Sequence, residues 1–154
     1  MKEGSALIPL IALIVSWALF RVIGLLGASY FDEWHTTLQA AVAIMLLLTA
    51  SAHWGAKRKD LVRMVPPAFP QPGRIVSITG YLEIAGAIGI MIPALSLYAS
   101  IGLVLLLIAM FPANIYAARH KLTLSGRPVP SLPVRTLIQI IFLTVVVLAS
   151  PLFN

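Results

Sequence analysis

The sequence predicts an all-α protein, a transmembrane helical bundle that forms one domain over residues 1–154. Hydrophobic residues make up 60% of the chain and charged residues only 10%, whereas a soluble domain is about 45–50% apolar and about 25% charged. The net charge of +6 comes from basic residues that lie beside apolar stretches. This distribution is typical of a protein in contact with a lipid bilayer and does not indicate nucleic-acid binding.

Five apolar stretches are expected to be helices, because each is close to the about 20 residues that a helix needs to cross a bilayer. They are Ala6–Gly27, Thr36–Trp54, Arg74–Ile92, Leu95–Ala118 and Pro133–Pro151. The first has no cleavage site after it, so we expect it to remain in the mature protein. Only a short turn separates the third from the fourth, which predicts an antiparallel hairpin.

The loop of residues 55–73 mixes basic and apolar residues and then becomes rich in proline. The first part predicts a short interfacial helix on an anionic membrane surface. The prolines favour an extended path, which could form a strap across one mouth of the bundle. The alternative is a solvated loop without a further role.

The basic residues predict the orientation of the chain. If all five stretches cross, ten of the eleven Lys and Arg residues lie on one side, and Arg21 is the exception, near Asp32 and Glu33. The positive-inside rule then predicts a cell (inner) membrane protein with a cytoplasmic N-terminus and an outer C-terminus.

Glu83 lies in the middle of the third apolar stretch and is the strongest candidate for a functional residue. A carboxylate at the bilayer centre costs on the order of 3 kcal/mol even on lenient scales. Thr79, Gly80, Gly86 and Ala87 lie three or four residues away and share its helical face. Small residues are typical of helix–helix contacts in membranes, so we expect Glu83 to face the bundle interior.

Other polar residues are predicted to share one cavity with Glu83 in the cytoplasmic half. His53 and Glu83 are the candidate catalytic residues, and the candidate ligand-binding residues are Asn114, Arg63, Thr79 and Gln139. Glu83 could be neutral and bonded to Asn114 or Thr79, or ionised and paired with His53. Each of these residues also has a plain interpretation, such as an interfacial His beside Trp or an interhelical hydrogen bond.

Two further features are given no functional role. The residues around Glu83 lack the spacing of a helical metal-binding motif, and no metal site is predicted. His35, with Asp32 and Glu33, is interpreted as part of a solvated loop on the outer side.

Five stretches of the sequence carry a family resemblance: SAHW at Ser51–Trp54, RMVPPAFPQP at Arg63–Pro72, TGYLEIAGAIGIMIP at Thr79–Pro93, MFPANIYAA at Met110–Ala118 and RTLIQ at Arg135–Gln139. From the second apolar stretch onward, the chain resembles the DoxX family of small bacterial membrane proteins. The resemblance implies a four-helix core, to which Ala6–Gly27 would be an N-terminal addition. It also implies a link to quinone-dependent redox or sulfur metabolism.

Three functions remain open on the sequence alone. In the first, the protein is a redox-linked membrane subunit in which Glu83 and His53 handle protons and Asn114 orients a quinone-like or small anionic ligand. Quinone is then the expected cofactor, and a partner redox subunit would supply the electrons. A homo-oligomer is the alternative assembly. The second function is a small transporter or channel, and the third is a scaffold or assembly factor without catalytic activity.

Overall fold

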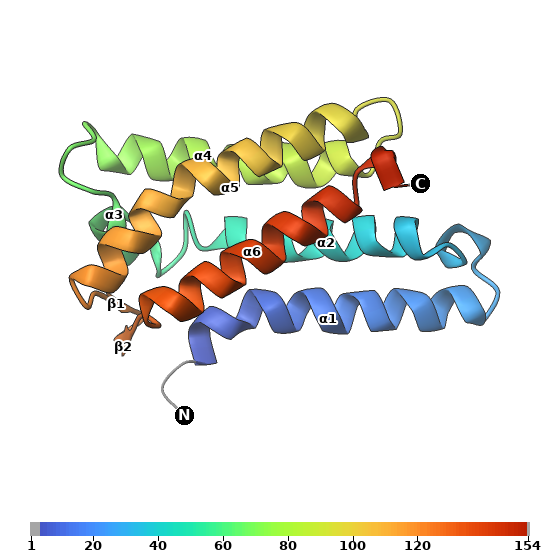
Figure 1. The fold of residues 1–154 in the computed structure, drawn as a ribbon, viewed down its shortest axis with the longest axis horizontal. Coiled ribbons are helices and arrows are strands. Elements are labelled where there is room, and N and C mark those ends of the chain that lie inside the picture. The colour runs from blue at the N-terminus through green and yellow to red at the C-terminus, as the bar shows by residue number, and fades with distance from the viewer. Residues whose placement is uncertain (1–3, 154) are drawn as a thin grey trace.

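The protein is a bundle of α-helices, as the sequence predicts (Figure 1). The computed structural model describes residues 4–153. In this range the elements are α1 (Gly4–Leu25), η1 (Ser29–Phe31), α2 (Trp34–Ser51), α3 (Arg58–Met64), α4 (Pro72–Ile90), α5 (Ser96–Arg119), β1 (Thr123–Leu124), β2 (Arg127–Pro128), α6 (Leu132–Leu148) and η2 (Pro151–Phe153).

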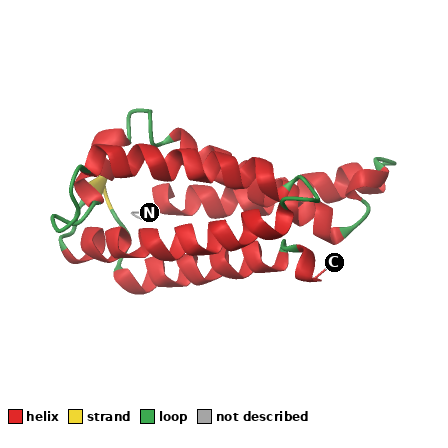
Figure 2. Cartoon of the chain, turned by 90° about the horizontal axis from the view of Figure 1, so that it is seen from above, coloured by secondary structure: helices red, strands yellow, loops and turns green. Residues whose placement is uncertain are grey.

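The long helices run back and forth along one axis, and the connections gather at two ends (Figures 1 and 2). We call one the α3 end, because it holds α3, the β1–β2 hairpin and the start of α1. The opposite end, here the η1 end, holds η1, the turn between α4 and α5, and η2. The α4–α5 pair is the antiparallel hairpin that the sequence predicts, and the described chain begins and finishes at opposite ends.

Four helices are long and apolar enough to cross a membrane: α1, α2, α4 and α5. The protein is therefore a multi-pass membrane protein. The fifth apolar helix, α6, has 17 residues and is about 25 Å long at 1.5 Å per residue. It is shorter than the hydrocarbon core of about 30 Å, so a fifth crossing stays a prediction.

The bundle core lies where α2, α4, α5 and α6 meet, and Val42, Ile90, Leu103 and Val146 are fully buried there. The predicted small-residue face of α4 is confirmed. A Cβ atom added at Gly86 would lie 2.3 Å from a Cδ atom of Leu103, so α4 and α5 approach closely because Gly86 has no side chain. By contrast, α1 packs along α2 and turns many large apolar side chains outward.

Two small elements connect at the α3 end. The predicted helix in the loop of residues 55–73 is present as α3, and the prolines follow it up to the first turn of α4, where Pro72 needs no hydrogen-bond partner. The second element, the β1–β2 hairpin, was not predicted. Its turn residues Ser125 and Gly126 both have positive φ, as a tight two-residue hairpin turn requires. The backbone N–H of Ser125 donates to the carboxylate of Asp60 in α3 at 2.7 Å. This hydrogen bond joins α3 and the hairpin, which together cover this end of the bundle.

Candidate functional site

A cavity of about 550 Å³ lies inside the α3 end. All six α-helices contribute to its wall: Ile8 from α1, Met45 from α2, Leu61 from α3, Thr79 from α4, Leu107 from α5 and Phe142 from α6. The proline-rich segment after α3 adds Pro66 and Phe69. The loop of residues 55–73 therefore helps to close the cavity, as the strap interpretation predicts.

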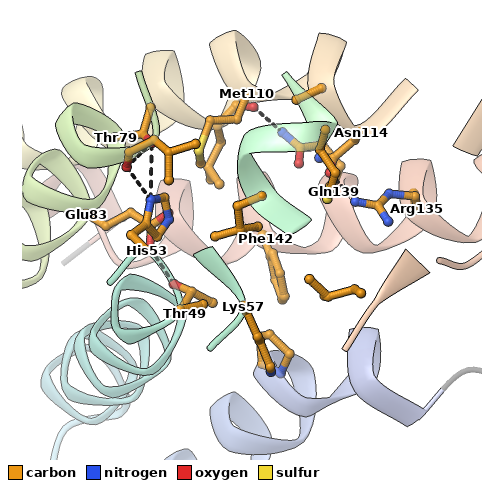
Figure 3. A pocket seen from close by; sticks show the side chains of 18 of the residues that line it. Thr49, His53, Lys57, Thr79, Glu83, Met110, Asn114, Arg135, Gln139 and Phe142 are labelled. Carbon is orange, nitrogen blue, oxygen red and sulfur yellow. Dashed lines mark hydrogen bonds and ion pairs between the residues drawn. The ribbon is translucent and has the colours of Figure 1, made fainter. Parts of the chain in front are cut away.

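His53 and Glu83 form a buried pair in the cavity wall (Figure 3). The Nε2 atom of His53 lies 3.2 Å from Oε1 of Glu83, and the two residues are 7% and 4% exposed. The hydroxyl of Thr49 donates to the second carboxyl oxygen, Oε2, at 2.6 Å. Both oxygens of Glu83 thus have partners, which offsets part of the cost of burying a carboxyl group.

The position of His53 depends on a glycine and an arginine. A Cβ atom at Gly80 would lie 2.8 Å from Cβ and Cγ of His53, so the ring reaches the backbone of α4 only because residue 80 has no side chain. Arg58 donates to the carbonyl of His53 at 2.7 Å and to the carbonyl of Gly73 at 3.0 Å. Arg58 therefore ties the end of α2 to the start of α4.

The hydrogen bonds define how many protons the pair holds. Nδ1 of His53 lies 2.5 Å from the carbonyl oxygen of Val76, which can only accept, so Nδ1 carries a proton. One further proton is needed between Nε2 and Oε1, and it can belong to either atom. The pair is then either an imidazolium with a carboxylate or a neutral imidazole with a carboxylic acid. Both forms share the same single proton between Nε2 and Oε1, and that proton is the one a group in the cavity could receive.

A second polar cluster in the cavity wall joins α5 and α6 (Figure 3). Arg135 donates through Nη2 to Oδ1 of Asn114 at 2.5 Å. One turn further along α6, Gln139 donates to the carbonyl of Leu107 at 2.7 Å. Pro112 in α5 has no N–H and cannot donate to the carbonyl of Ile108. Gln139 bonds to the neighbouring carbonyl, that of Leu107.

The structure brings five of the six predicted site residues to this cavity: His53, Glu83, Thr79, Asn114 and Gln139. The sixth, Arg63, does not line the cavity. Its side chain is 61% exposed and lies 3.7 Å from the carboxylate of Asp60, because the helical turn of α3 directs it away from the bundle. Its assignment as a ligand-binding residue has no support from this geometry.

Among the partners proposed for Glu83, His53 lies next to it, while Asn114 is bonded to Arg135 instead. The hydroxyl of Thr79 lies 3.4 Å from Nδ1 of His53 and donates within its own helix. The neutral arrangement predicted from the sequence, with Glu83 bonded to Asn114 or Thr79, is therefore not observed.

The sequence interpretation did not name Thr49, Lys57 or Arg135 as site residues, although all three line the cavity. Thr49 precedes His53 by four residues, and that spacing could have placed both on one helical face. Arg135, at the start of α6, turns to Asn114 of α5. Across residues 4–153, no three His, Cys, Asp or Glu side chains come together as a metal site.

Residues 42–150 match a family that is described as a domain of unknown function, DUF8561. The match covers His53, Glu83, Asn114 and Arg135 and leaves out α1. No curated protein matches the chain, and no solved structure matches it either. The resemblance to the DoxX family thus stays a prediction from the stretches quoted above. Because the match spans more than half of the chain and includes both polar clusters, the chain belongs to the DUF8561 family.

Proposed function

We propose that the protein is a redox-linked membrane subunit that binds a quinone-like molecule in its cavity and exchanges protons with it through His53 and Glu83. The observation that carries this proposal is the buried His53–Glu83 pair in the wall of a cavity of about 550 Å³. That volume is within the about 300–1,000 Å³ of small-molecule sites. The lining is mostly apolar, as a quinone ring and its isoprenoid tail require.

The chemistry assigned to this chain is proton transfer. Reduction of a quinone to a quinol takes up two electrons and two protons. The His53–Glu83 pair would deliver one proton at a time to a quinone oxygen and then be reprotonated from the α3 end. The electrons would come from a partner redox subunit, as the resemblance to the DoxX family implies. Thr49 would keep Glu83 oriented while its charge changes.

We further propose that the α3 end faces the cytoplasm and that the protein lies in the inner membrane of a bacterial cell. The basic residues of α3 and of the connection from α5 to α6 support this orientation under the positive-inside rule. Reporter fusions after residue 121 and at the C-terminus provide the test. We expect the first to report the cytoplasm and the second to report the outside, and two reporters on the same side would contradict a crossing by α6.

One observation favours a scaffold as the second candidate function. Within the described part of the chain, every buried side-chain nitrogen and oxygen has a hydrogen-bond partner. Polar groups that are already paired can serve to specify helix packing alone. A scaffold would retain no small molecule, whereas the redox proposal requires one.

The deciding experiment purifies the protein in native-lipid polymer discs and measures quinone by solvent extraction and mass spectrometry. We expect a near-stoichiometric quinone in the wild type and a large loss in Glu83→Gln. Glu33→Gln removes an exposed carboxylate at the η1 end and serves as the matched control. Equal quinone in the wild type, Glu83→Gln and empty discs would reject the proposal and favour the scaffold.

A further inference from the structure

The second polar cluster of the cavity contains a cation without an acidic partner among the described residues. Arg135 is half-buried, and its guanidinium makes one hydrogen bond, to Asn114. A guanidinium has five N–H donors arranged to bind a planar or tetrahedral oxyanion. Most of the donor capacity of Arg135 is thus free for a group that enters the cavity.

The acidic side chains that the structure describes are all engaged or distant. Asp32 and Glu33 lie at the η1 end. Asp60 accepts from Ser125 and lies beside Arg63, and Glu83 is bonded to His53 and Thr49. None of these four carboxylates forms an ion pair with Arg135.

A second cation and an amide donor line the same cavity. Lys57, between α2 and α3, is half-buried in the wall. Because Asn114 uses its oxygen to accept from Arg135, its NH₂ group remains as a donor. In a partly open but largely apolar space, half-buried cations gain from a counter-charge, and an anion that enters would form strong charge-assisted hydrogen bonds.

We infer that Arg135 and Asn114 form an oxyanion site, which holds a carboxylate, phosphate or sulfate-like group at the wall of the cavity, and that Lys57 in the same wall adds positive charge. The apolar side chains of Met110, Ile138 and Phe142 line the same cavity and can hold an attached hydrocarbon chain. The anion is therefore either a free inorganic oxyanion or the acidic head of a single-chain amphiphile. This inference deepens the proposed function by naming a second ligand class for the same cavity, but its test needs no quinone.

The test measures the melting temperature and ligand affinity of the full chain in discs of phosphatidylcholine, which has no net charge. One arm titrates sodium sulfate against sodium chloride at equal ionic strength. The other arm titrates dodecyl phosphate against dodecanol, which has the same chain and no anion. We expect at least one anion to raise the melting temperature of the wild type well above its neutral or chloride control. A response to sulfate indicates a free oxyanion, and a response to dodecyl phosphate alone indicates an amphiphile.

Three variants link the response to the site. Arg135→Gln should weaken the binding of the anion by about tenfold or more. Arg135→Lys should retain part of the affinity because it keeps the positive charge. Asn114→Asp places a carboxylate against Arg135, so it should abolish the response while the fold is retained. Arg127→Gln removes an equal charge from the exposed strand β2 and should leave the affinity unchanged.

Two results would overturn the oxyanion site. One is the absence of any anion-specific response in the wild type, and the other is an equal response in the wild type, Arg135→Gln and Asn114→Asp. Glu83→Gln should keep the anion response, because Glu83 is bonded to His53 and Thr49 and not to this cluster. If the wild type binds anions but retains no quinone, the redox proposal has failed and the oxyanion site stands. If the wild type retains quinone but shows no anion response, the oxyanion site has failed and the redox proposal stands.

Discussion

Both ends of the bundle bury a histidine, but the two histidines have different surroundings. At the η1 end, His35 is 3% exposed and its Nε2 atom lies 2.9 Å from the carbonyl oxygen of Ser150. At the α3 end, His53 is almost equally buried, contacts Glu83 and lines the cavity. His35 therefore fastens the end of α6 to the start of α2, whereas His53 has a titratable partner and open space beside it.

The amides of the two ends differ in the same way. Gln39 donates to Ser96 and to the carbonyl of Ala149, both at 3.0 Å, and so joins α2, α5 and the end of α6. Gln139 donates to one carbonyl at the cavity wall. Burial of a polar residue is thus a poor guide to function. The features that distinguish the α3 end are a carboxyl–imidazole pair and a cavity that a ligand could enter.

Four substitutions test this comparison, in order of the expected loss of stability. The first acts on the core that both ends share. Gly86→Leu forces a side chain into the space of the fully buried Leu103, and overpacking of this kind costs about 1–3 kcal/mol or more. We expect the largest drop in melting temperature in detergent, because the packing of both the η1 end and the α3 end depends on this core. Gly102→Leu is the control, because a Cβ atom at Gly102 meets nothing within 4 Å. Equal melting of the two variants would show that α4 and α5 do not pack as described.

The second substitution acts on the η1 end alone. Gln39→Leu leaves the hydroxyl of Ser96 and the carbonyl of Ala149 without this donor, which costs about 1–3 kcal/mol for buried groups. We expect a clear fall in melting temperature and unchanged ligand retention at the α3 end. Gln139→Leu should cost less, because one bond is lost and the carbonyl faces a cavity. A larger loss for Gln139→Leu would contradict the contrast between a packed end and a hollow end.

The third substitution moves His53 without changing either member of its pair. Gly80→Ala places a methyl group 2.7 Å from Cη2 of Trp54 and 2.8 Å from Cβ and Cγ of His53, so both rings must shift and His53 moves away from Val76 and Glu83. We expect a stability loss of about 1 kcal/mol and a strong loss of quinone retention. In Gly73→Ala the nearest atom lies at 3.8 Å, and this variant should behave like the wild type. Full quinone retention by Gly80→Ala would show that the position of His53 is not needed for binding.

The fourth substitution should change stability least. In Glu83→Gln the amide can donate to Nε2 of His53 and accept from Thr49, so both hydrogen bonds persist. We expect a melting temperature close to that of the wild type, with loss of proton exchange and of quinone retention. Glu33→Gln is again the control. Unchanged quinone retention in Glu83→Gln would make Glu83 a structural residue like His35.

Much of the fold could be predicted because the signals are local. The apolar stretches match the helices to within a few residues at each end, since hydrophobicity and length decide helix formation in a membrane. The direction of Glu83 followed from helical periodicity, with Gly80, Gly86 and Ala87 on one buried face. The interpretation of His35 as a solvated residue was wrong, because the end of α6, 115 residues away in sequence, covers it.

The sequence by itself determined an all-helical membrane protein and a carboxyl group that faces the interior of the bundle. Both follow from hydrophobicity and from periodicity within single helices. Only the tertiary structure decided which groups meet. Because α2 packs on α4, His53 and Thr49 reach Glu83, and because α5 packs on α6, Asn114 bonds to Arg135. Such pairings depend on the rotation and approach of whole helices, which glycines such as Gly80 and Gly86 permit and which no single stretch of sequence encodes.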